Sequence, residues 1–120
     1  MQPAEKLIFD IIEQAIKEAR RDGYRYYVSQ QVNGWNVSVR LPGNFIVYDT
    51  AVSGEEAVRK AKNCINRYVR KARKWLISED CHNYFEELDM ENTHNIVVRW
   101  VECGCPKQED AVRMKEKICG

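Results

Sequence analysis

The chain has 120 residues, 44% hydrophobic and 31% charged, and its 19 Lys and Arg nearly balance its 18 Asp and Glu. These values are ordinary for a globular protein, and the length predicts a single domain over residues 1–120. A net charge of +1 argues against bulk electrostatic attraction to a long nucleic acid, which favours a strongly basic domain.

No apolar run approaches the roughly 20 residues that a membrane span requires, and the N-terminal stretch lacks the basic region of a signal peptide. We therefore expect a cytoplasmic protein with no membrane partner. Five cysteines, an odd number, indicate reduced thiols instead of a disulfide framework. Cys103 and Cys105, with Cys81–His82 far away, match zinc-ligand spacing poorly, so no metal and no cofactor are expected.

Residues 4–22 predict an amphipathic helix, because apolar residues recur at spacings of three and four between Leu7 and Ala19. Gly23 follows the last turn as a stop signal. Ile16 widens the apolar face, which could serve a subunit contact as well as a core.

The hydrophobic period then changes to two, which predicts a hairpin over residues 24–41. Asn33–Gly34 between two alternating runs indicates a type I′ turn, and this turn would pair Val32 with Trp35 and Val28 with Val39. Residues 45–49 are expected to form a third strand.

A strongly basic helix is predicted next. Ser53 and Glu56 form a capping-box pattern before it. Residues 57–76 contain eight cations and no acid, and an apolar stripe from Val58 to Leu76 leaves the cations on the other face. Residues 78–94 then contain six acids and neither Lys nor Arg.

The remaining elements are a short helix over 79–89, a fourth strand over 95–101 and a last helix over 106–118. The order predicts an α+β fold. We expect an antiparallel four-stranded sheet with N-terminal, central and C-terminal helices packed mainly on one face.

The basic helix has two interpretations. Lys and Arg often lie solvated, with their stems over apolar neighbours. Here, however, like charges stand four residues apart without an acid between them, as in Arg67–Lys71 and Arg70–Lys74, and such pairs repel. Either the acidic segment folds back onto this helix or an anionic ligand offsets the repulsion.

Catalysis finds little support in the sequence. The chain has two histidines and contains no phosphate-binding glycine loop, HExxH or GxSxG motif. Cys81 and His82 are neighbours in sequence, but no third group orients them. We therefore expect a protein that is not an enzyme.

Two families resemble this chain. The order helix, three strands, helix over residues 4–76 is similar to a double-stranded RNA-binding domain, which contacts phosphates from the start of its last helix. Glu55 and Glu56 stand where that family has lysines. An RNA-binding module therefore stays an alternative, as does an inhibitor, such as a phage protein, that binds a host defence protein.

The whole chain also resembles the phage-encoded Thoeris anti-defence sponges, non-enzymatic proteins that sequester cyclic ADP-ribose-type signals and, in some cases, cyclic oligonucleotides. The resemblance implies a homo-oligomer whose ligand is held by an aromatic ring, an asparagine and cations of the last helix. Phe85, Asn92 or Asn95, Arg113 and Lys117 occupy comparable places. Assisting cations or a second anion site would come from Arg59, Lys60, Arg21 and Arg25.

Overall fold

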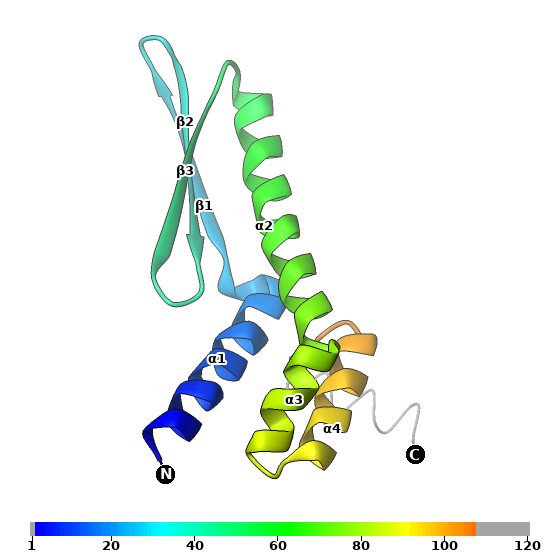
Figure 1. The fold of residues 1–120 in the computed structure, drawn as a ribbon. Coiled ribbons are helices and arrows are strands. Elements are labelled where there is room, and N and C mark those ends of the chain that lie inside the picture. Colours follow the sequence, from blue (N-terminus) through cyan, green and yellow to red (C-terminus); the bar gives the residue numbers. More distant parts are fainter. Residues whose placement is uncertain (1, 108–120) are drawn as a thin grey trace.

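The computed structural model describes residues 2–107, and these form a three-stranded antiparallel sheet and four α-helices (Figure 1). The elements are α1 (Pro3–Ala19), a 3-10 turn η1 (Arg21–Gly23), β1 (Arg25–Gln31), β2 (Gly34–Leu41), β3 (Phe45–Ala51), α2 (Gly54–Leu76), α3 (Glu79–Glu87) and α4 (Glu91–Glu102). No helix of this described part is long and apolar enough to cross a membrane.

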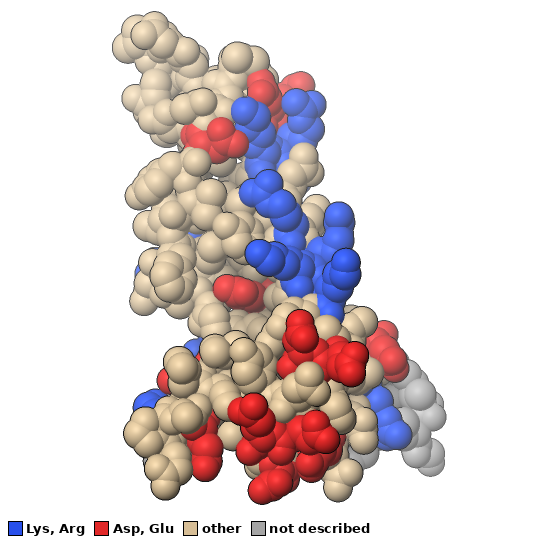
Figure 2. All heavy atoms as spheres, viewed as in Figure 1, with Lys and Arg blue, Asp and Glu red and all other residues tan. Residues whose placement is uncertain are grey.

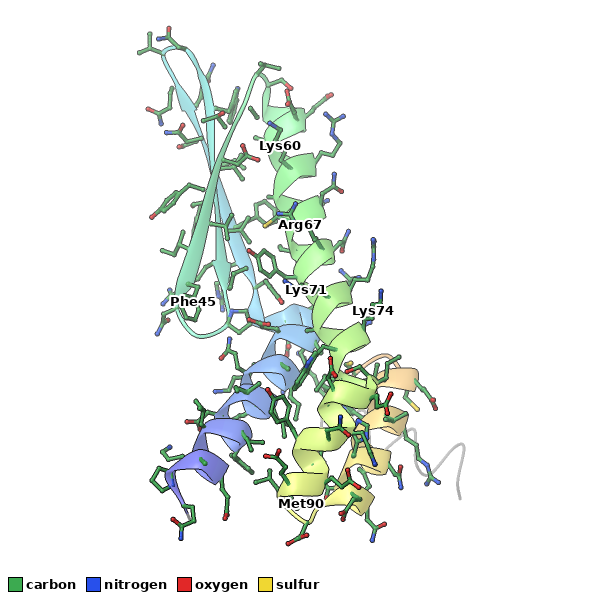
Figure 3. All side chains as sticks on the ribbon, viewed as in Figure 1. Phe45, Lys60, Arg67, Lys71, Lys74 and Met90 are labelled. Carbon is green, nitrogen blue, oxygen red and sulfur yellow. The ribbon has the colours of Figure 1, made fainter. Side chains whose placement is uncertain are left out.

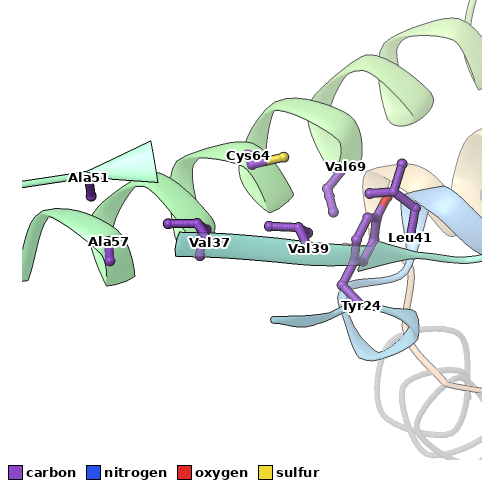
Figure 4. Close-up of a cluster of buried hydrophobic side chains, with 9 residues drawn as sticks. Tyr24, Val37, Val39, Leu41, Ala51, Ala57, Cys64 and Val69 are labelled. Atoms are coloured by element: carbon purple, nitrogen blue, oxygen red, sulfur yellow. The ribbon is translucent and has the colours of Figure 1, made fainter. Parts of the chain in front are cut away.

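The sheet is a meander in the order β1–β2–β3, and α2 crosses one of its faces (Figure 1). The core between them joins Val37, Val39 and Leu41 of β2 to small residues of α2 (Figure 4). Ala57 and Ala61 are fully buried, so the helix backbone lies close to the sheet. The α+β class is therefore confirmed, with the helix covering one face of the sheet.

The hairpin forms with a register that differs from the prediction by two residues. Gln31 pairs with Gly34, and Val28 pairs with Val37, so Val32 and Asn33 occupy the turn in place of Asn33 and Gly34. Gly34 has a φ of 146° and lies against β3, where an added Cβ would be 2.9 Å from the Ala51 carbonyl oxygen. This close approach places the glycine in the strand. Because the shift is two residues, each side chain keeps its predicted face.

The predicted capping box at the start of α2 is confirmed. The Glu56 backbone N–H donates to the Ser53 hydroxyl oxygen at 3.1 Å, and the Glu56 carboxylate accepts from the Val52 N–H at 3.2 Å. The first bond satisfies a backbone donor that the first turn of a helix leaves without an intrahelical partner, and the second satisfies the N–H of Val52, the residue before the cap.

A second core lies at the other end of α2, where α1, α3 and α4 gather around Ala72 and Leu76. α1 contributes Ile12, Ala15 and Ala19 to it. Ile8 and Ile16 are half-buried against this core, while Leu7, Phe9 and Ile11 remain at the surface, with Leu7 63% and Ile11 38% exposed. The wide apolar face expected for this helix is thus only partly covered by residues 2–107.

The predicted fourth strand is wrong, because residues 91–102 form helix α4 and the sheet has three strands. The run of Ile96, Val97 and Val98 has strand propensity, but propensity yields to tertiary packing. Positions 94, 97, 98 and 101 recur at helical spacing and face inward, while Ile96 is 67% exposed. The predicted last helix over 106–118 lies almost wholly outside the described residues.

His94 connects the last turn of α2 to the helices that follow. It is 5% exposed, its Nε2 lies 2.8 Å from the Leu76 carbonyl oxygen, and its Nδ1 lies 3.1 Å from Nδ1 of His82. A carbonyl can only accept, so Nε2 of His94 donates to it, and the Nδ1 atoms of the two rings share the second hydrogen bond. One imidazole therefore satisfies a carbonyl at the end of α2 and joins α3 to α4.

Replacing His94 by Phe should lower the free energy of unfolding by about 1–3 kcal/mol, because a ring remains but the Leu76 carbonyl loses its donor. Urea unfolding at pH 7.5 measures the change. His82→Phe is the control, since it removes only the bond between the two rings, and it should cost less. Equal stability of His94→Phe and wild type would contradict this assignment.

Candidate functional site

The outer side of α2 carries an exposed row of cations, which we call the basic face: Arg59, Lys62, Arg67, Arg70, Lys71 and Lys74. Figure 2 shows Lys and Arg following α2 as one continuous band. Their position follows from the sequence, because the apolar positions of α2 bind the sheet and the second core and leave the basic positions to solvent.

The two remaining cations of α2 are used by the protein itself. The Lys60 ammonium lies 3.3 Å from the Glu56 carboxylate and 3.9 Å from that of Asp49, and it donates to the Thr50 carbonyl at 2.7 Å. Arg73 donates to the carbonyls of Ala19 and Gly104, at 2.9 and 3.2 Å. Hydrogen bonds from the Val52 N–H and then from Lys60 hold the pKa of Glu56 below its usual value. Lys60 is thus engaged in contacts that join the start of α2 to β3.

The basic face is not neutralised within residues 2–107, where none of its six cations lies within 4.0 Å of a carboxylate. The acidic segment forms α3 and the start of α4, and Figure 2 shows its carboxylates gathered at the opposite end of the molecule from most of the band. Of the two expected ways to offset the repulsion, folding back of this segment does not occur among the described residues.

An open groove lies beside the basic face, between α1 and α2. Its volume is about 470 Å³, within the range of small-molecule sites. Tyr68 and Trp75 line it from α2, and Ile11 and Ala15 line it from α1. Its polar lining groups are Asp10, Gln14, Glu18 and Lys71.

Cations adjoin the aromatic wall of this groove. Lys71 is itself a lining residue, and the Arg67 guanidinium lies 5.9 Å from the centroid of the Tyr68 ring. The Trp75 ring packs against the Tyr84 ring, with centroids 5.8 Å apart. Figure 3 shows Arg67, Lys71 and Lys74 following one another along α2. Of these cations only Lys71 lines the groove, while Arg67 lines a separate hollow between α2 and the sheet and adjoins the groove through the Tyr68 ring.

The residues expected to hold the ligand are not brought together. Phe85 is 3% exposed and stacks on His94, with ring centroids 5.1 Å apart, so its faces are occupied by the core. Asn92 and Asn95 are exposed on α4 and do not line the groove. Arg113 and Lys117 lie outside the described residues, and their role stays a prediction.

The expected assisting cations are separated as well. Arg59 lies on the basic face, one turn from the start of α2. Arg21 donates a hydrogen bond to the side chain of Asn66. Arg25 is at the start of β1, on the sheet face turned away from α2. These residues do not form one anion site.

The sequence did not predict the groove, because the groove depends on which helices pack together. Tyr68, Lys71, Ala72 and Trp75 are spaced by three and four, which places them on one side of a helix. That signal was visible in the sequence but indicated core packing equally well. The opposite wall comes from α1, almost 60 residues earlier, and no local pattern pairs the two helices.

The chain matches no family model, and no curated protein or solved structure is significantly similar to it. The resemblance to the sponge family therefore stays a prediction. The resemblance of the order α1–β1–β2–β3–α2 to a double-stranded RNA-binding domain likewise stays a prediction.

Cys81 does not have the environment of a catalytic nucleophile. It is fully buried, and burial raises the pKa of its thiol to about 11. The neighbouring His82 directs its Nδ1 to His94. A reactive thiol requires the opposite conditions, exposure and a lowered pKa.

Iodoacetamide at pH 8 should therefore alkylate the exposed Cys103 of the native protein and leave Cys81 intact. Peptide mapping by mass spectrometry after a timed quench distinguishes the two sites. In urea both should react. Labelling of native Cys81 at the rate of Cys103 would show that its burial is incomplete.

Proposed function

We propose that this protein binds a phosphorylated, nucleotide-like ligand without converting it. The base would occupy the groove between α1 and α2, and the phosphates would lie on Arg67 and Lys71. The observation that carries the proposal is the junction of an aromatic groove with cations that have no carboxylate partner within residues 2–107.

The groove suits a base and its sugar. Tyr68 and Trp75 provide aromatic surface, and bases are commonly held by stacking on such rings. Asp10, Glu18 and Gln14 offer oxygen acceptors to an amino group or a sugar hydroxyl. Gln14 is already oriented, because its Nε2 donates to the Pro42 carbonyl at 2.8 Å.

The cations suit the phosphates. Arg binds phosphate oxygens through its planar fork, and Lys acts as a mobile point charge. A bound phosphate would also relieve the repulsion between Arg67 and Lys71, which stand four residues apart on α2. The same ligand charge therefore contributes both a direct attraction and the removal of an unfavourable pair.

Capture without turnover agrees with the groups that line the groove. No thiol, serine or imidazole is among the lining residues of this described cavity, and both histidines are bonded in the second core. In its narrowest form, the proposal is that the ligand is a cyclic ADP-ribose-type or cyclic oligonucleotide signal that the protein sequesters. The exposed apolar residues of α1 would then contact a second copy of the chain.

Calorimetry with a panel of cyclic and linear nucleotides tests the proposal. Replacing Arg67 and Lys71 together by Gln should weaken binding about tenfold or more, because each removes a charge-assisted hydrogen bond. The control is Lys62→Gln, which removes an exposed α2 cation that neither lines the groove nor lies over one of its aromatic rings. Equal heats of binding for the double variant and wild type would contradict ligand binding in the groove. Heat-released ligand of altered mass would contradict capture without turnover.

The length of the basic face favours a second candidate, binding to a double-stranded RNA. Arg59 to Lys74 spans about 22 Å at a rise of 1.5 Å per residue. A nucleotide bound in the groove would not reach all six cations, whereas the phosphate backbone of a duplex could follow them.

Under this candidate, gel shift with duplex RNA should give an affinity that falls steeply with salt. Arg59→Gln and Arg70→Gln, neither of which changes a residue that lines the groove, should each reduce the slope of log affinity against log salt concentration by about one. A groove variant that abolishes nucleotide binding while this slope stays unchanged would separate the two functions. An affinity that does not depend on salt would contradict binding to duplex RNA.

A further inference from the structure

The sheet face turned away from α2 is uncovered by any described helix (Figure 1). We call it the outer sheet face. Its side chains are exposed except for the half-buried Ser38, and they come from all three strands: Arg25, Tyr27, Ser29, Asn36, Ser38, Arg40, Ile46, Tyr48 and Thr50. An uncovered face that carries large aromatic side chains calls for an explanation, because such residues normally pack in a core.

Strand register places two tyrosines in one row across the sheet. Tyr27 pairs with Ser38, and Ser38 pairs with Tyr48, so a small residue separates the two rings. Tyr27 is 64% exposed and Tyr48 is 74% exposed. A hollow of about 580 Å³ lies here, lined also by Ser29, Asn36, Asp49 and Thr50. The hollow thus combines two ring faces with amide and hydroxyl groups.

Two arginines stand beside this row. Arg25 and Arg40 are direct partners across β1 and β2, two residues along each strand from the tyrosine row. Like charges directly opposite on a sheet destabilise it. Neither arginine pairs with a carboxylate within residues 2–107, and Arg40 donates instead to the Asn44 side chain at 2.7 Å. An anion between the two guanidinium groups would offset their repulsion.

We infer that the outer sheet face binds single-stranded nucleic acid. Bases stack on Tyr27 and Tyr48, and a phosphate lies between Arg25 and Arg40. Asn36, with its amide donor and acceptor, is placed to bond a base edge. Charge complementarity selects this occupant: an aromatic hollow beside a pair of cations matches the alternation of base and phosphate along a strand. The one carboxylate that lines the hollow, Asp49, lies 3.9 Å from the Lys60 ammonium.

A duplex does not fit this face, because its bases are stacked on one another and cannot stack on protein rings. The outer sheet face is also separate from the groove between α1 and α2, since α2 packs on the other side of the sheet. The inference is therefore independent of the function proposed above, and the two can fail separately.

Fluorescence anisotropy with labelled 12-nucleotide oligo(U) and oligo(dT), and with a 12-base-pair duplex, tests the inference. Tyr27→Ala and Tyr48→Ala should each weaken single-strand binding about fivefold or more, while Tyr→Phe retains the ring and most of the affinity. Phe45→Ala is the matched control. Phe45 is 63% exposed, like Tyr27, but belongs to the sheet face toward α2.

Tighter binding of either single strand than of the duplex, lost in the two alanine variants and kept in Phe45→Ala, supports the site. Comparison of oligo(U) with oligo(dT) assigns the strand to RNA or to DNA. Unchanged affinity in the Tyr27→Ala/Tyr48→Ala double variant overturns the inference. So does conversion of a dimer to monomers in that variant without loss of binding, which would make this face a contact between copies of the chain.

Discussion

The packing of α2 against two separate cores is the constraint on which the rest of the structure depends. Its first half lies on the sheet through Ala57, Ala61 and Cys64, and its last turns join the helical cluster through Ala72 and Leu76. The alanines and Cys64 are small and allow close contact on one side, and the strong segregation of charge leaves the cations on the other. The same amphipathic pattern therefore builds the fold and creates its most basic surface.

Each candidate binding surface is a consequence of this arrangement. The groove exists because α1 packs beside the end of α2 and leaves Tyr68 and Trp75 partly uncovered. The outer sheet face exists because α2 covers only one side of a three-stranded sheet. Charge is also separated, because the acids of α3 lie apart from the basic face of α2 (Figure 2). A nearly neutral chain can therefore present a locally strong positive potential.

Interpretation from sequence succeeded where short-range rules apply and failed where partners are remote. The helix spans, the capping box of Ser53 and Glu56, and the strand faces follow from periodicity and local hydrogen bonding. Residues 95–101 were assigned to a strand because β-branched side chains dominate them, yet burial of His94, Val97 and Val101 against α2 and α3 favours a helix. The resemblance to the sponge family predicts a ligand-binding role for Phe85, whereas the structure buries its ring against His94.

The sequence by itself determined the amphipathic faces and the separation of charge, because side-chain periodicity and cation spacing are properties of neighbouring residues. Only the tertiary structure decided where those faces meet. Pairing of α1 with α2 formed the groove, a close approach of Gly34 to β3 set the hairpin register, and the Arg25–Arg40 pair came from that register. Contacts between residues far apart in the chain depend on mutual packing of whole elements, and no local pattern encodes them.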